Sequence, residues 1–190
     1  MREAAILDKA WALLGDKPLS QITIEDLVSG AAISRSTFYF YFESKEAVMR
    51  ALAARVADEI RDVFAEARFA KGAVDVRRSI AGYLARWRTK GRVLRAMAIL
   101  VETDPALRDF WEGVTEELLD EAAAALDEQR REGRVLPAPP ASKDLVRALF
   151  AMLWRTGYEL SVRPTSRAEE KRIVDTLATV IVRSCTGAGA

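Results

Sequence analysis

The stretch I-S-R-S-T-F-Y-F-Y-F, from Ile33 to Phe42, decides how this chain is interpreted. Ser34 can cap a short helix, and the rings that follow cannot all face a core, because neighbouring helix positions lie about 100° apart. Phe38 and Phe42 are four residues apart and should pack inward together. The positions left facing outward are Arg35, Ser36, Tyr39 and Phe40.

A second short helix is predicted just before this one. Thr23 precedes Ile24-Glu25-Asp26, which is a threonine cap with a carboxylate three residues on, and the helix should reach about Ala31. Two short helices joined by a tight turn have the spacing of a helix-turn-helix, whose second helix enters the DNA major groove. An outward set of arginine, hydroxyls and aromatic rings suits such a groove contact.

The rest of the chain is also predicted to be helical, because apolar residues recur at three-and-four spacing and no stretch alternates as a strand would. Ser142 should cap a late helix, and Ser166 with Glu169 should form a capping box. We expect an all-α fold of about nine helices: 4–14, 24–31, 34–40, 44–70, 74–90, 92–102, 104–132, 142–163 and 167–185. The expected domains are a three-helix DNA-binding domain at 1–48 and a larger helical domain at 49–190.

Composition narrows the function classes. The 190 residues are 50% hydrophobic and 30% charged, as in a globular protein, with no run of about 20 apolar residues that could span a membrane. No histidine is present, which excludes His-dependent triads and the common zinc sites. Cys185 is the single cysteine and fits a reducing compartment. We therefore expect a cytoplasmic protein without metal or cofactor, and an enzyme is disfavoured.

Charge is unevenly distributed although the net charge is only +1. Residues 71–100 carry eight basic side chains against one acidic, and residues 101–132 carry eleven acidic against three basic. The favoured interpretation is two neighbouring helical regions whose outer faces attract each other or face water; a phosphate-binding face on the basic stretch is the alternative. Residues 1–50 hold six basic and seven acidic side chains, an unusually low balance for a DNA-binding module.

The segment I-S-R-S-T-F-Y-F-Y-F-E-S-K-E-A-V, Ile33 to Val48, resembles the DNA-binding signature of TetR-type transcriptional regulators. The agreement runs from Leu13 to Val48 and is most similar to the ethionamide-resistance repressor (EthR) branch, with weaker matches at 124–133 and 174–177. One position departs from the family pattern: Ala32 stands where the family has glycine in the turn. A positive φ there would cost alanine about 1 kcal/mol.

The resemblance implies roles for individual residues. Arg35, Ser36, Thr37 and Phe40 would face the major groove, and Tyr39 and Tyr41 would reach phosphates through their hydroxyls. Thr23, Ser34 and Lys45 stand at helix N-termini, where free N–H groups favour a phosphate. Thr23 and Ser34 can serve as plain N-caps as well.

The second domain concentrates aromatic residues, which are either core packing or the lining of a pocket for an apolar small-molecule effector. The resemblance favours the pocket, with these candidates: Tyr83, Trp87, Phe110, Trp111, Phe150 and Trp154. The last two helices, 142–163 and 167–185, are apolar around much of their circumference and are expected to form a homodimer interface that includes Leu177 and Ile181.

Taken together, the sequence predicts a ligand-responsive regulator, most simply a repressor, that binds a pseudo-palindromic double-stranded DNA operator as a homodimer. Two alternatives remain at this level. One is a helix-turn-helix used as a protein-interaction module, and the other is a small all-α enzyme relying on carboxylates, Lys, Tyr or Cys185.

Overall fold

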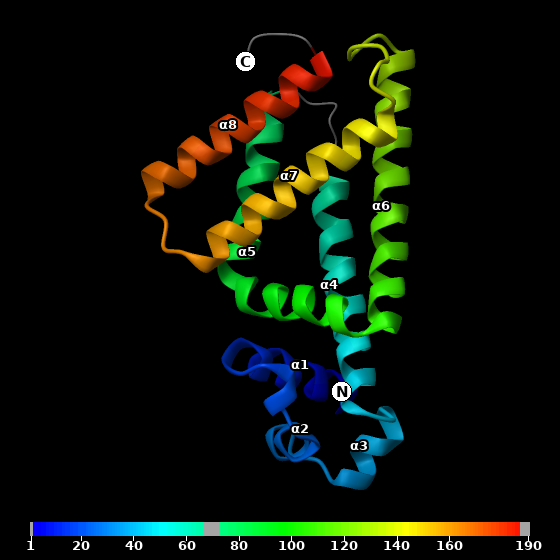
Figure 1. Ribbon diagram of the computed structural model, residues 1–190, viewed down its shortest axis with the longest axis vertical. Helices are drawn as coiled ribbons and strands as arrows, with labels where there is room; N and C mark the ends of the chain where they lie inside the picture. Colours follow the sequence, from blue (N-terminus) through cyan, green and yellow to red (C-terminus); the bar gives the residue numbers. More distant parts are fainter. Residues whose placement is uncertain (1, 67–72, 187–190) are drawn as a thin grey trace. The chain divides into compact units, whose positions relative to one another are not determined.

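The computed structural model describes residues 2–66 and 73–186, and all regular structure in these ranges is helical (Figure 1). The α-helices are α1 (Arg2–Asp16), α2 (Ile24–Gly30), α3 (Arg35–Tyr41), α4 (Lys45–Glu66), α5 (Ala73–Thr103), α6 (Pro105–Arg131), α7 (Ser142–Val162) and α8 (Arg167–Thr186), with one 3-10 turn, η1 (Leu19–Gln21). The all-α prediction is confirmed. The predicted end of the fourth helix near Ala70 lies outside the described residues. None of the described helices is both long and apolar enough to cross a bilayer.

Helix α5 corrects the predicted helix count. The sequence suggested two helices, 74–90 and 92–102, whereas the structure has one continuous helix of 31 residues. Gly91 lies inside it and is buried. A glycine lowers helix stability by only about 1 kcal/mol, and no proline follows to block the hydrogen-bond ladder, so packing keeps the helix intact.

The chain divides into two compact units, Met1–Glu59 with Arg92–Trp111, and Ile60–Gly91 with Glu112–Ala190. Helices α4, α5 and α6 each contribute residues to both units. The functional boundary expected at residue 48 stays a prediction; by contacts, residues 49–59 and 92–111 belong with the first unit.

In the first unit, the short helices α1 to α3 gather around one core, with α4 and the end of α5. Its centre is built from fully buried apolar residues spaced three or four apart on their helices, the pattern of an amphipathic helix packing on one face. Its members include Ile6, Ala10, Leu27, Phe38, Val48, Leu52, Met97 and Leu107. This core fixes the orientation of α3 through Phe38, which has no exposed surface.

Helix starts follow the predicted caps with one exception. Thr23, Ser34 and Ser166 each accept a hydrogen bond from the backbone N–H three residues on, as predicted, and Ser44 and Asp104 do the same at the starts of α4 and α6. Ser142 does not cap α7: Ala141 takes the N-cap position and makes no side-chain bond. The Ser142 side chain is instead buried, donating to the Asp127 carboxylate and accepting from Arg130. A buried hydroxyl needs such partners, and α6 supplies them.

The second unit packs the first part of α5 and the later part of α6 with α7 and α8, which form a helical hairpin (Figure 1). Arg130 ties down the proline-rich linker before α7, donating to the carbonyls of Leu136 and Pro140 at 3.1 and 2.8 Å. Ion pairs correct the expected pairing of the two charged stretches. Basic α5 pairs with α8, as in Arg77–Asp175, and acidic α6 pairs with α7, as in Glu116–Arg147.

Candidate nucleic-acid interface

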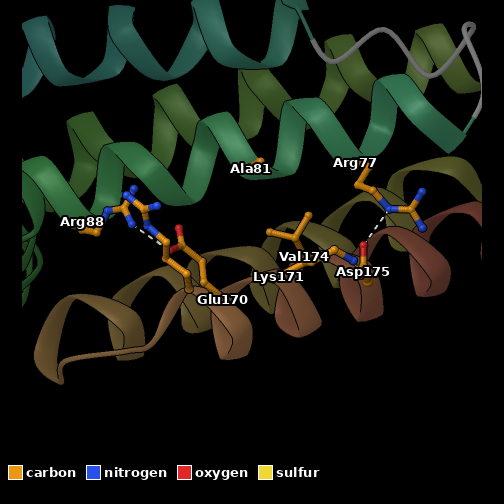
Figure 2. A pocket seen from close by; sticks show the side chains of 8 residues that line it. Arg77, Ala81, Arg88, Glu170, Lys171, Val174 and Asp175 are labelled. Carbon is orange, nitrogen blue, oxygen red and sulfur yellow. Dashed lines mark hydrogen bonds and ion pairs between the residues drawn. The ribbon is translucent and has the colours of Figure 1, made fainter.

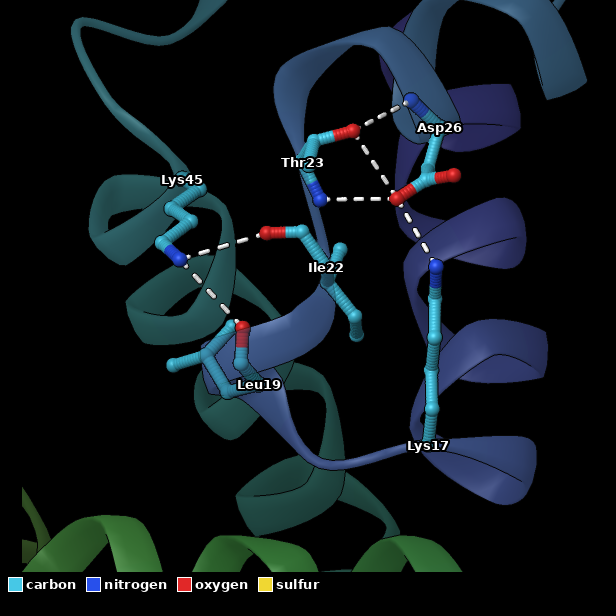
Figure 3. A network of polar contacts seen from close by, with 6 residues as sticks. All are labelled: Lys17, Leu19, Ile22, Thr23, Asp26 and Lys45. Atoms are coloured by element: carbon cyan, nitrogen blue, oxygen red, sulfur yellow. Dashed lines mark hydrogen bonds and ion pairs between the residues drawn. The ribbon is translucent and has the colours of Figure 1, made fainter.

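The N-terminus of α2 is held by a capping box (Figure 3). The Thr23 side chain accepts from the Asp26 N–H at 3.1 Å, and the Asp26 carboxylate accepts from the Thr23 N–H at 2.8 Å. Lys17 on the preceding turn donates to the same carboxylate at 2.8 Å. The hydrogen bonds from Lys17 and Thr23 hold the pKa of Asp26 well below its usual range. Thr23 is exposed at this rigid helix end, where the N–H groups of a helix favour an anion.

The turn between α2 and α3 has the strained backbone that the sequence suggested. Ala32 adopts φ +52°, in the left-handed region, and its side chain is exposed. Its neighbour Ile33 donates its N–H to the carbonyl of Val28 at 3.1 Å, which closes the turn. A glycine would adopt this φ without the clash of a Cβ atom.

The side chains of helix α3 are divided between the core and the solvent as predicted. Phe38 and Phe42 are buried, with their ring centroids 6.2 Å apart. Phe40 is 81% exposed and Tyr39 is 49% exposed, and their neighbours Arg35, Ser36 and Tyr41 are also exposed. Because exposed rings of this size cost solvation free energy, such a row points to a recognition surface.

The hydroxyls at the start of α3 form a small network. The Ser34 Oγ lies 2.8 Å from the Ser36 Oγ and 2.8 Å from the Thr37 Oγ1, and it also accepts from the Thr37 N–H at 3.1 Å. Ser34 and Ser36 are exposed and Thr37 is partly buried. Each hydroxyl can both donate and accept, so the network orders the groups and leaves them with hydrogen-bonding capacity toward solvent.

Lys45 is more tightly held than a surface lysine at a helix start. Its Nζ donates to the carbonyl oxygens of Leu19 at 3.3 Å and Ile22 at 3.2 Å (Figure 3). The ammonium therefore joins α4 to the segment directly before Thr23. One of its three N–H groups remains for another acceptor, since an ammonium has three donors.

The candidate ligand-binding residues fall into both units. Tyr83, Trp87, Phe150 and Trp154 belong to the second unit, whereas Phe110 and Trp111 belong to the first. Trp87 is 2% exposed and meets Trp154 edge to face, with centroids 4.9 Å apart.

Tyr83 and Gly157 complete the surroundings of Trp87. Burial raises the pKa of Tyr83, and the neighbouring Trp87 side chain offsets this in part. The Trp87 ring packs so closely on α7 that a Cβ atom at Gly157 would lie 2.3 Å from it.

Two contacts at the candidate site could not be predicted from the sequence. Lys17 stabilises the α2 cap from nine residues away, and Lys45 binds carbonyls more than twenty residues away. No local pattern indicates such contacts, because they depend on how the helices pack. Among the described residues, no three His, Cys, Asp or Glu side chains gather where they could hold a metal ion.

Comparison with known proteins agrees with this geometry. Residues 6–52 match the model for the bacterial regulatory proteins of the tetR family, and residues 76–187 match the model for the C-terminal domain of the transcriptional regulator EthR. The chain is 34% identical over 195 residues to the HTH-type transcriptional regulator EthR of Mycobacterium tuberculosis, covering 98% of this chain and 88% of the relative. It is 32% identical over 189 residues to the protein of the same name from Mycolicibacterium smegmatis, covering 98% and 87%.

A solved structure supports the fold. The crystal structure of a putative TetR-family transcriptional regulator from Mesorhizobium loti superposes with a TM-score of 0.81 at 17% identity, covering 97% of this chain and 96% of that one. The helix-turn-helix, the two family models and the full-length relatives lead to one conclusion: the chain belongs to the TetR family of DNA-binding transcriptional regulators and has an EthR-type C-terminal domain.

Proposed function

We propose that this regulator is a homodimeric repressor that binds a pseudo-palindromic operator through α3 and leaves it when an apolar small molecule binds. The observation that carries the proposal is the exposed row on α3, above all Phe40, anchored from behind by the buried ring of Phe38. A row of rings, hydroxyls and one guanidinium on a rigidly seated short helix suits the major groove.

The proposed contacts divide into base readers and phosphate anchors. The base readers are Arg35, Ser36, Thr37 and Phe40; the phosphate anchors are Thr23, Ser34, Tyr39, Tyr41 and Lys45. Because residues 1–50 have no net positive charge, placed groups and helix ends must supply the attraction. We therefore expect modest affinity for unrelated DNA.

A pull-down of genomic fragments followed by sequencing tests DNA recognition and yields the operator. Phe40→Ala and Tyr39→Ala should abolish enrichment of that site. Ile99→Ala is the matched control, because Ile99 is another large apolar residue of the first unit, 62% exposed and outside α3. Loss of binding in the control to the same degree would contradict the assignment, and a footprint without inverted symmetry would contradict the dimeric arrangement.

The proposed dimer uses the outer faces of α7 and α8. The structure corrects two expected interface residues: Leu177 and Ile181 are 5% and 4% exposed within a single chain, so a charge there would disrupt this chain's own core. Val180 on α8 and Val162 on α7 are 40% and 61% exposed, and they face outward.

Val180→Glu tests this interface by sedimentation. We expect the dimer to dissociate while the monomer stays folded, because a charge buried in an apolar interface costs several kcal/mol. Lys171→Glu, an exposed substitution nine residues before Val180 and on the opposite side of α8, is the control. A wild-type protein that sediments as a monomer at micromolar concentration would exclude the proposed dimer.

The proposed effector site is the aromatic cluster of the second unit: Trp87, Phe150, Trp154 and Tyr158. Ligand and operator are linked, so a molecule that prefers a non-binding conformation weakens DNA binding by its differential affinity, typically about 1–3 kcal/mol. Compounds from an apolar library that raise the melting temperature should also release operator DNA. Trp154→Ala should weaken both effects, because it removes part of the proposed site. Trp154 is chosen over Trp87 because it is only half-buried, so the fold tolerates its loss better.

Two outcomes would favour the alternatives. A folded protein that captures no DNA fragment but binds another protein through α3 would be an interaction module. If instead the protein chemically converts the compounds that stabilise it, it would be an enzyme. Retention of operator release in Trp154→Ala and in Phe150→Ala would place the effector elsewhere.

A further inference from the structure

A charged groove of about 580 Å³ runs between α5 and α8 in the second unit (Figure 2). We call it the basic groove, and it is lined by Arg77, Ala81, Arg88, Arg167, Glu170, Lys171, Val174 and Asp175. It is separate from the aromatic cluster in residue content. It also contains part of the basic stretch 71–100, which neither the proposed DNA contacts nor the proposed effector site uses.

The two helices present matching faces to the groove. On α5, Arg77, Ala81 and Arg88 lie four and seven residues apart and so share one side of the helix. Ion pairs close both ends, Arg77 with Asp175 at 2.8 Å and Arg88 with Glu170 at 2.7 Å. Between these ends, Ala81 and Val174 face each other and form a small apolar floor (Figure 2).

Positive charge is in excess along this groove. Four cations line it against two carboxylates, which leaves a local charge of +2. Asp175 is shared, since it pairs with Lys171 at 2.7 Å as well as with Arg77, and these cations lower its pKa. Arg167 has no ion pair or hydrogen bond from its side chain among the described residues. The groove thus contains positive charge that is not neutralised by the protein's own ion pairs.

We propose that the basic groove binds a small polyanion that carries phosphate or carboxylate groups. The guanidinium groups of arginines offer paired N–H donors that match both kinds of oxyanion. The volume is that of a small-molecule site, and the apolar floor strengthens the field of the surrounding charges. A DNA backbone fits less well, because Glu170 and Asp175 stand at the two ends and would repel a long row of phosphates.

Titration calorimetry with sodium triphosphate and with citrate, at constant physiological ionic strength, tests the proposal on the full-length protein. The wild type should bind one ion per chain, and the stronger of the two probes identifies phosphate or carboxylate as the preferred group. Arg167→Glu should weaken that binding about tenfold or more, because it removes the uncommitted cation and adds a repelling charge. The melting temperature of this variant without ligand should stay unchanged.

Arg172→Glu is the matched control, with the same charge change on an exposed residue of the same helix outside the groove. It should change the affinity less than about threefold, because its side chain does not line the groove and salt screens an exposed charge. Equal losses of affinity in the two variants would show that only the overall charge of the protein matters, and would overturn the proposed site.

Glu170→Gln provides a test of opposite sign. Removing this carboxylate frees Arg88 and raises the local charge, so binding should become several-fold tighter. Weaker binding in Glu170→Gln, or no binding of either probe by the wild type at millimolar concentration, would overturn the proposal. Displacement of the probes by random duplex DNA at equal phosphate concentration would instead assign the groove to nucleic acid and likewise overturn it. None of these results bears on α3, so the proposed DNA function is tested separately.

Discussion

On α3, the rings of Tyr39, Phe40 and Tyr41 stand in solvent, whereas in the second unit Tyr83 and Trp87 are 6% and 2% exposed. The same residue class therefore has two uses in one chain. A buried ring contributes apolar area and edge-to-face contacts to stability, and an exposed ring contributes to stability only when a partner covers it. The contrast teaches that aromatic content alone does not identify a site, because exposure decides between packing and recognition.

Truncating one ring from each region should give the largest difference. Trp87→Ala should lower the free energy of unfolding by about 3–5 kcal/mol, because it leaves a cavity beside Trp154 and Gly157. Phe40→Ala should change it by less than about 0.5 kcal/mol, since its ring is 81% exposed. Urea unfolding measures both free energies. Comparable losses in the two variants would show that exposure does not separate packing rings from recognition rings.

Operator binding should show the reverse order. Arg35→Ala should cost about 1–3 kcal/mol at its contacted base pair and relax the preference there, while Trp87→Phe should leave the apo protein's affinity near wild type. Gel-shift titrations against a panel of single-base operator variants measure this. A Trp87→Phe variant that loses specificity as Arg35→Ala does would remove the distinction between the two regions.

Lys45 sharpens the comparison within the first unit. Lys45→Ala should weaken binding to all DNA sequences alike and lower the salt slope by about one unit. It also removes the hydrogen bonds to Leu19 and Ile22, so unfolding must be measured beside affinity. An unchanged salt slope with reduced stability would assign Lys45 a structural role alone.

A smaller effect is expected in the turn that orients α3. Ala32→Gly should raise the free energy of unfolding by about 1 kcal/mol, because glycine relieves the φ of +52°. Ala31→Gly is the control: its φ is −93°, so glycine there should stabilise nothing. Thermal unfolding distinguishes the two, and a destabilising Ala32→Gly would show that the methyl group has a packing role.

The smallest effects concern acid, because the groups involved are exposed. Two hydrogen bonds, from Arg147 and Lys143, lower the pKa of Glu116 from 4.5 to about 2, and the pKa of Asp26 is lowered from 3.8. A depressed folded-state pKa adds stability above the unfolded value, and that stability is lost as pH falls below about 4.5 for Glu116 and below 3.8 for Asp26.

The melting temperature should therefore fall less steeply with decreasing pH in this acidic range for Glu116→Gln in the second unit and for Asp26→Asn in the first. Glu25→Gln, beside Asp26 in the first turn of α2, is the control. A wild-type profile in both variants would show that these contacts are too exposed to matter.

Local sequence sufficed for much of the first unit. Thr23 and Ser34 cap their helices because a short side-chain oxygen reaches the N–H three residues on, whatever the rest of the chain does. Phe38 and Phe42 lie inward and Phe40 outward because a helix turns about 100° per residue. The positive φ at Ala32 was expected from the family resemblance, because the family has glycine at this turn position.

Packing between distant segments decided the rest. Gly91 remains helical and Ser142 is buried because other helices cover them, and Leu177 and Ile181 face this chain's own core. Several helices carry apolar and charged faces of similar strength, so sequence periodicity cannot choose which of them pair. By itself, the sequence therefore determined the all-helical class, most of the helices and caps, and the outward row of α3. Only the tertiary structure placed Lys45 on the carbonyls before Thr23 and brought the cations of α5 and α8 together, because such contacts form between residues that no local rule connects.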